Sequence, residues 1–86
     1  MGKIEKVVHA VLSGQSDGNV AFADLCQLLK RLEFSVRIRG DHHIFSHEKV
    51  EEIINLQPKG SKSKPYQVKQ VRNVILKYKL RPYDEE

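Results

Sequence analysis

The hydrophobic periodicity of this 86-residue chain changes between Leu32 and Phe34, and that change limits the folds it can adopt. Before it, apolar residues recur every three to four positions, as on one face of a helix. After it, apolar and polar residues alternate, as in a strand with one buried face. The chain therefore combines helices with a sheet.

Two helices are predicted before this change. Residues 3–12 carry one apolar face, which consists of Ile4, Val7, Val8, Val11 and Leu12. Gly14 ends this helix, because glycine adopts the left-handed conformation at little cost. Residues 21–32 carry a second apolar face, which consists of Phe22, Leu25, Cys26, Leu29 and Leu32. Since Cys26 lies within it, we expect a buried small hydrophobe and not a nucleophile.

Three short strands are predicted next, over residues 34–39, 42–46 and 51–56. Tight turns, the first at Gly40-Asp41, make them an antiparallel meander. A loop over residues 57–65 leads to a helix that Pro65 opens and that runs to about Lys79. Its apolar face consists of Val68, Val71, Val74, Ile75 and Tyr78. The predicted fold class is α+β, a three-stranded antiparallel sheet packed on helices.

The length predicts a single domain over residues 1–86, with a small core that buries roughly 60% of the unfolded surface. No apolar run approaches the ~20 residues of a membrane helix, and residues 3–12 lack the apolar core of a signal peptide. A lone cysteine cannot form an internal disulfide, which favours a reducing, cytoplasmic location.

Basic residues are concentrated in the C-terminal half. Between residues 53 and 83 there are eight Lys and Arg and no Asp or Glu: Lys59, Lys62, Lys64, Lys69, Arg72, Lys77, Lys79 and Arg81. Such asymmetry indicates a polyanionic partner. A solvated helix face has the same composition, so both interpretations stay open.

His42 and His43 begin the second predicted strand, after the turn at Gly40-Asp41. Adjacent strand residues point to opposite faces, so at most one of the two faces the core. A histidine near nucleic-acid phosphates can move the proton of a 2′-hydroxyl at neutral pH. A polar turn whose histidine is satisfied by backbone groups is the alternative.

A metal site is disfavoured. The helical zinc motif needs a second histidine four residues after His47, and that position is Glu51. Alternation also splits His42, His43 and His47 between two faces. His9 is expected on the surface of the first helix.

Other cations extend the candidate surface. Arg37 and Arg39 share the outward face of the first strand. Residues 59–66 join three lysines to a helix start, where backbone N–H groups favour phosphate. The glycine spacing of a P-loop is missing.

Residues 40–47 resemble the Gly-Ser-His-His-Ile-Phe-x-His signature of the HicA toxins, with Asp41 in place of the common serine or glycine. Residues 55–58 (Asn-Leu-Gln-Pro) and 64–72 (Lys-Pro-Tyr-Gln-Val-Lys-Gln-Val-Arg) resemble the loop and final helix of one branch of that family. The resemblance spans about residues 22–80.

This resemblance implies a small mRNA interferase, the toxin of a type II toxin–antitoxin module. It implies a fold similar to a double-stranded-RNA-binding domain, with the order α-β-β-β-α over about residues 20–80. The helix over residues 3–13 would be an addition to that core, and residues 82–86 a flexible acidic tail. It also implies that His42 is catalytic, with His43 as the alternative, that Gly40 shapes the turn, and that a HicB-type antitoxin protein covers the site.

The leading hypothesis is an endoribonuclease that needs no metal or other cofactor, with His42 as general base or acid. The residues expected to hold the RNA backbone are Arg37, Arg39, Lys59, Lys62, Lys64, Lys69 and Arg72. A non-catalytic nucleic-acid-binding module and an adaptor for an acidic protein are the alternatives, since fold alone does not separate them.

Overall fold

The computed structural model describes residues 2–82. Its elements, in chain order, are α1 (Lys3–Ser13), the 3-10 turn η1 (Asp17–Asn19), α2 (Phe22–Arg31), β1 (Ser35–Arg39), β2 (His42–His47), β3 (Val50–Leu56), β4 (Pro58–Lys59), β5 (Lys62–Ser63) and α3 (Pro65–Tyr78). Three helices and a three-stranded antiparallel sheet confirm the predicted α+β class. The tail predicted over residues 82–86 lies, apart from Pro82, outside the described residues.

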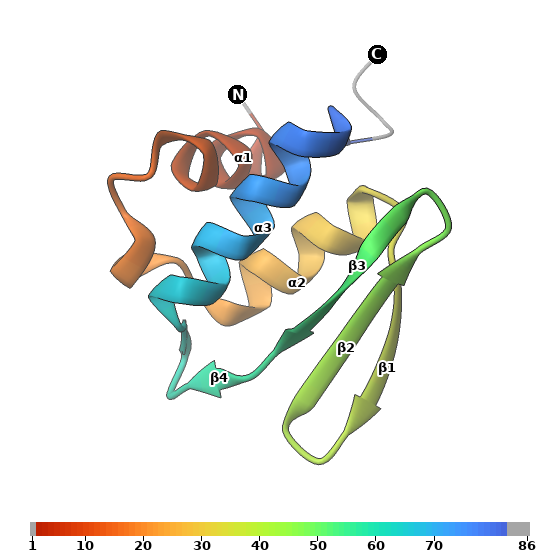
Figure 1. Cartoon of the computed structure of the whole chain (residues 1–86). Coiled ribbons are helices and arrows are strands. Elements are labelled where there is room, and N and C mark those ends of the chain that lie inside the picture. Colours follow the sequence, from red (N-terminus) through yellow and green to blue (C-terminus); the bar gives the residue numbers. More distant parts are fainter. Residues whose placement is uncertain (1, 83–86) are drawn as a thin grey trace.

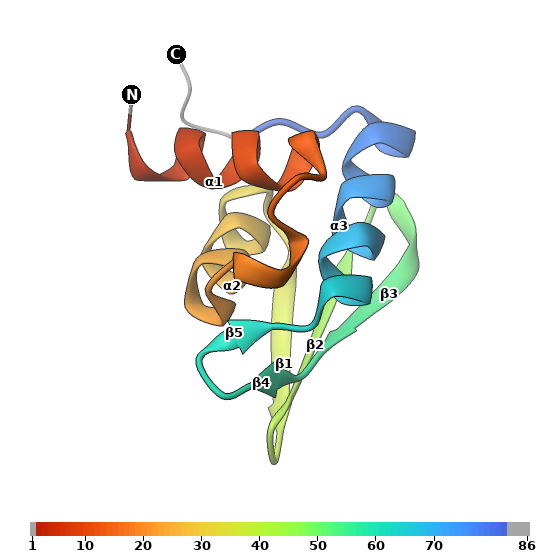
Figure 2. The same cartoon turned by 90° about the vertical axis from the view of Figure 1, so that its left-hand side faces the viewer.

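The sheet has the strand order β1-β2-β3, as a meander requires. Helices α2 and α3 pack on one of its faces, and none of the helices in residues 2–82 covers the other (Figure 1). Helix α1 lies across one end of α2 and α3, whereas the β1–β2 turn lies at the opposite end (Figures 1 and 2). We call the uncovered side of the three strands the open face.

The core lies between the helices and the face of the sheet that they cover. Its largest fully buried side chains are Phe45, Leu25, Leu28, Leu29, Ile54 and Leu56. Cys26 is also buried, as expected, and burial raises the pKa of its thiol to about 11. The apolar face predicted for α1 is only partly used, since Val7 and Val11 are buried but Leu12 is exposed.

The β1–β2 hairpin extends past the helices (Figure 1). Burial therefore decreases from Phe34, which is buried just before β1, through Val36 to Ile38, which is 60% exposed. Gly40 begins the turn with φ +60°, while Asp41 keeps a negative φ. A two-residue hairpin turn with glycine first and only that residue at positive φ is of type II′, a conformation that favours glycine at this position.

The prediction of a loop over residues 57–65 was wrong in part. Strands β4 and β5 form a small antiparallel hairpin there. The hairpin is tied to the start of α2, because Ser63 N–H donates to Val20 O at 2.8 Å and Phe22 N–H donates to Ser61 O at 3.0 Å. The second bond satisfies a backbone donor of the first helical turn that would otherwise lack a partner.

None of the helices described in residues 2–82 has the length and apolar character to cross a membrane.

Candidate functional site

His42 and His43 occupy different faces of the sheet, as strand alternation predicted. His43 points to the helices, where its ring meets Phe22 edge-on with centroids 4.9 Å apart. Its Nδ1 atom is buried and has no hydrogen-bond partner among residues 2–82. His42 lies on the open face, and its side chain is 47% exposed. Of the two histidines, His42 is therefore the one that an RNA on the open face can reach.

Both ring nitrogens of His42 have a polar neighbour. Nδ1 lies 3.2 Å from Oδ1 of Asn55, on the adjacent strand β3. Nε2 lies 3.7 Å from Oδ1 of Asp41, in the turn. The amide oxygen can only accept a hydrogen bond, so the ring nitrogen that faces it donates. The imidazole is thus held in one orientation on an otherwise exposed hairpin.

Asp41 is itself part of a hydrogen-bonded chain. Its Oδ2 accepts a bond of 3.0 Å from Nε2 of Gln57, whose Oε1 accepts one of 3.0 Å from Nζ of Lys64. The pKa of Asp41 is lowered, chiefly because Gln57 donates to it, with smaller contributions from the charges of His42 and Lys64. We call His42, Asp41, Asn55, Gln57 and Lys64 the His42 cluster. Through Gln57 and Asp41, the cluster connects His42 to Lys64, one of the predicted RNA-binding residues.

The end of β3 is fixed to α3 by one buried side chain. Gln67 is 4% exposed. Its Nε2 donates to the backbone oxygen of Asn55 at 3.1 Å, and its Oε1 accepts from the backbone N–H of Gln57 at 3.1 Å. Leu56, between these two residues, is fully buried. The backbone that carries Asn55 and Gln57, two members of the His42 cluster, is therefore held in a fixed position.

Arg37 and Arg39 also belong to the open face. In the sheet register Arg37 pairs with Ile44, and Arg39 pairs with His42. Residues paired in this way place their side chains on the same face. Both arginines are exposed. The structure therefore brings these two predicted RNA-binding residues together with His42.

The remaining predicted RNA-binding residues are more dispersed. Lys59 and Lys62 face each other across the β4–β5 hairpin, and Nζ of Lys62 donates to Oδ1 of Asn19 at 2.7 Å. Lys69 is exposed on α3. Arg72 is largely enclosed, and its guanidinium binds both carboxylate oxygens of Asp17. Of the seven predicted RNA-binding residues, Arg72 is thus the one whose guanidinium is largely enclosed and bound to a carboxylate of the fold.

The start of α3 offers little to an anion. Pro65 stands in the first turn and has no N–H. The N–H of Gln67 donates to Lys64 O at 2.9 Å. Phosphate binding near this helix would therefore depend on the Lys64 side chain more than on backbone groups.

His47 lies on the helix side of the sheet, and its ring contacts Phe34 with centroids 4.9 Å apart. Its Nδ1 accepts a bond of 3.0 Å from the Lys49 N–H. Within residues 2–82, no three His, Cys, Asp or Glu side chains lie close enough together to share a metal ion.

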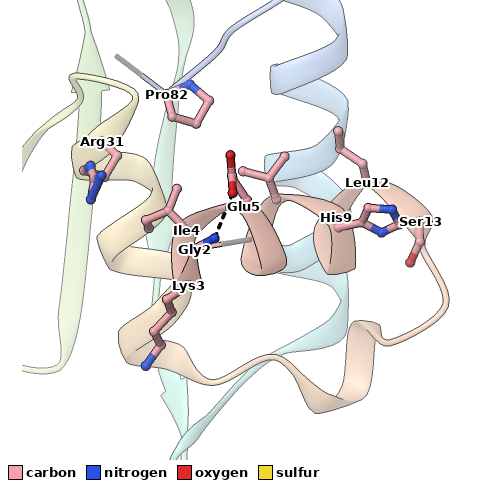
Figure 3. A pocket seen from close by; sticks show the side chains of 10 residues that line it. Gly2, Lys3, Ile4, Glu5, His9, Leu12, Ser13, Arg31 and Pro82 are labelled. Carbon is pink, nitrogen blue, oxygen red and sulfur yellow. Dashed lines mark hydrogen bonds between the residues drawn. The ribbon is translucent and has the colours of Figure 1, made fainter. Parts of the chain in front are cut away.

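A groove of about 690 Å³ runs beside α1, between that helix, Arg31 and Pro82 (Figure 3). Ile4, Val8 and Leu12 supply its apolar lining, and the exposed His9 stands at its rim. The groove includes no member of the His42 cluster, and it lies at the α1 end of the molecule, away from the β1–β2 turn (Figures 1 and 2).

Asn55, Gln57 and Gln67 were not predicted as site residues. Alternation around the apolar residues of β3 could have placed Asn55 on the open face. No sequence signal marks Gln67, which sits beside Val68 in the first turns of α3. The chain matches no protein-family model, no curated protein and no solved structure.

Proposed function

We propose that this protein is a toxin of the HicA type, an endoribonuclease that cleaves single-stranded regions of mRNA without a metal ion. The observation that carries the proposal is the position of His42. This histidine is exposed on an uncovered sheet face, is oriented by Asn55, and is connected through Asp41 and Gln57 to Lys64.

The proposed chemistry is transfer of the phosphodiester to the neighbouring 2′-hydroxyl. His42 removes the proton from the 2′-hydroxyl, and the 2′-oxygen then forms a bond to phosphorus while the bond to the 5′-oxygen breaks. The leaving 5′-oxygen takes up a proton from solvent water, and the products carry a 2′,3′-cyclic phosphate and a 5′-hydroxyl. Arg39 and Lys64 would stabilise the negative charge that develops on the phosphate oxygens.

The open face also supports the proposal of a protein antitoxin. Ile53 on β3 is 56% exposed, and Ile44 on β2 is half-buried. Apolar side chains next to Arg37 and Arg39 form the kind of surface that a partner protein covers. An acidic antitoxin bound there would block access to His42.

The order of elements supports a finer assignment of the fold. Without α1 and the β4–β5 hairpin, the chain runs α2-β1-β2-β3-α3. That order is the one expected of a core similar to a double-stranded-RNA-binding domain, and we propose that the core belongs to this class.

Asp41 favours one alternative, an RNA-binding module without catalysis. Its carboxylate lies 3.7 Å from Nε2 of His42 and would repel a phosphate that approached this nitrogen. The cation of Lys64, connected to this carboxylate through Gln57, offsets part of that repulsion. Measurement of cleavage decides between the two functions.

The test uses single-stranded RNA in EDTA, with the wild type, His42→Ala and His43→Phe. We expect the wild type to cut the RNA and leave cyclic phosphate ends, and His42→Ala to lose at least about 100-fold in rate. His43→Phe is the matched control, because phenylalanine keeps the ring contact with Phe22 and removes the unpaired buried Nδ1. It should fold and cleave like the wild type.

Three results would contradict the proposal. Salt-sensitive RNA binding without cleavage would establish the binding module. Loss of cleavage in EDTA would exclude the metal-free mechanism. Loss of cleavage in a folded His43→Phe variant, with activity retained in His42→Ala, would move the catalytic role to His43.

A further inference from the structure

We infer that Asn55 is a positioning residue for His42. Asn55 fixes Nε2 of His42 as the nitrogen that exchanges a proton with the RNA. This inference rests on the ribonuclease function proposed above. It adds a residue and a defined tautomer to that function, and the tautomer can be measured without any RNA.

The hydrogen bond between the two side chains determines the tautomer. Oδ1 of Asn55 lies 3.2 Å from Nδ1 of His42 and can only accept, so Nδ1 carries the hydrogen. In a neutral imidazole the other nitrogen then has the free lone pair. Nε2 is therefore the proton acceptor, and it is the nitrogen that lies beside Asp41.

The backbone at Asn55 is held in place because the buried Gln67 side chain binds the backbone on both sides of Leu56. His42, in contrast, follows a turn that extends past the helices (Figure 1). The Asn55 bond thus connects an exposed hairpin side chain to the part of β3 that is packed on α3. Without this bond, the imidazole could rotate about its side-chain bonds and either nitrogen could face the substrate.

The charged groups around His42 suit a proton-accepting Nε2. Asp41 stabilises the imidazolium that forms when Nε2 takes the 2′-hydroxyl proton. Lys64 acts through Gln57 from the β3–α3 side, and Arg39 is the residue paired with His42 on β1. Both cations can attract a phosphate, while the carboxylate lies 3.7 Å from the nitrogen. Asp41 would repel a phosphate, but in this arrangement it also has a favourable role, because it stabilises the protonated ring of His42.

The first measurement is a long-range ¹H–¹⁵N correlation spectrum of the histidine side chains, recorded above the pH at which His42 titrates. We expect His42 of the wild type to be in the Nδ1–H form. In Asn55→Leu, which has a similar size but no acceptor, this form should give way to the Nε2–H form that free histidine prefers in water. Asn55→Asp keeps an acceptor oxygen and should retain the Nδ1–H form.

The second measurement is cleavage over a range of pH. Asn55→Leu should lower kcat at least about tenfold while KM changes less than about threefold, because RNA binding is unaffected. Asn55→Asp should recover most of this activity, with the acid limb of its pH profile moved to higher pH by the added negative charge. Ser46→Ala, on the exposed side of β2, is the matched control and should behave as the wild type.

An Nε2–H form in the wild type would overturn the inference, and so would an unchanged tautomer and kcat in a folded Asn55→Leu variant. The two proposals can fail separately. If the wild type does not cleave RNA but Asn55→Leu still changes the tautomer, Asn55 orients His42 and the ribonuclease function is wrong.

Discussion

Arg72 of α3 donates two parallel hydrogen bonds to Asp17 of η1, from Nη1 to Oδ1 at 2.9 Å and from Nη2 to Oδ2 at 3.2 Å. The same guanidinium donates to the backbone oxygen of Val11 at 3.1 Å, so it joins the end of α1 and the turn η1 to α3. Bidentate pairs of this kind fix geometry as well as charge. The sequence predicted an RNA contact for Arg72, whereas the structure gives it partners within the fold.

Arg72→Ala is therefore expected to lower the free energy of unfolding by about 2 kcal/mol, because it leaves the Asp17 carboxylate and the Val11 carbonyl without their donor. Thermal unfolding should show a melting temperature lower by roughly 10 °C. Lys69→Ala, an exposed change on the same helix, should alter stability little. The double variant Asp17→Ala/Arg72→Ala should be less destabilised than the sum of the single changes. A stable Arg72→Ala protein with weakened RNA binding would restore the RNA-contact interpretation.

Gln67→Leu should affect stability and activity together. Leucine fits the buried position but leaves the Asn55 carbonyl and the Gln57 N–H without their partner, at a cost of roughly 1–3 kcal/mol. Since these backbone groups position the His42 cluster, cleavage by the folded variant should also decrease. Urea unfolding and RNA cleavage below the transition measure the two effects. Gln70→Leu, one turn further along α3, is the control and should change neither. Full activity in Gln67→Leu would show that the cluster does not depend on this side chain.

Periodicity in the sequence was sufficient for the helices and for the opposite orientation of His42 and His43, because both follow from local backbone geometry. It could not predict the β4–β5 hairpin. Each strand has two residues, too few to show alternation, and the hairpin is held by residues 20–22, which are distant in the chain. The role of Arg72 was missed for the same reason, since Asp17 lies 55 positions earlier. These features depend on contacts that exist only after the chain has folded.

Glu52 should make stability depend on acid pH. Its carboxylate accepts bonds from Tyr78 Oη at 2.7 Å and from Lys77 Nζ at 2.9 Å. These contacts, the Lys77 bond first, lower the pKa of Glu52 from 4.5 to about 2. Because the folded-state pKa is below the unfolded one, the contribution is complete above the unfolded value and is lost as pH falls through the folded value.

Glu52→Gln should therefore melt below the wild type at neutral pH, and the difference should shrink as pH decreases from about 5 to about 2. Melting temperatures across this range check the prediction. Glu51→Gln is the control, because it removes the charge of the neighbouring exposed residue and keeps the backbone N–H that donates to Tyr78. A Glu52→Gln difference that persists unchanged at pH 2 would mean that the carboxylate charge is not responsible.

Arg37 and Arg39 should each contribute to RNA affinity by neutralising a phosphate. Both are exposed on the open face, and no hydrogen bond or ion pair involves the side chain of either one within residues 2–82. In a His42→Ala background, which prevents cleavage, the dissociation constant for single-stranded RNA is measured at several salt concentrations. Replacing either arginine by alanine should reduce the slope of log affinity against log salt by about 0.7. Lys6→Ala, an exposed cation on α1, should leave the slope unchanged. An equal reduction in Lys6→Ala would indicate that RNA responds to the total charge of the protein and not to the open face.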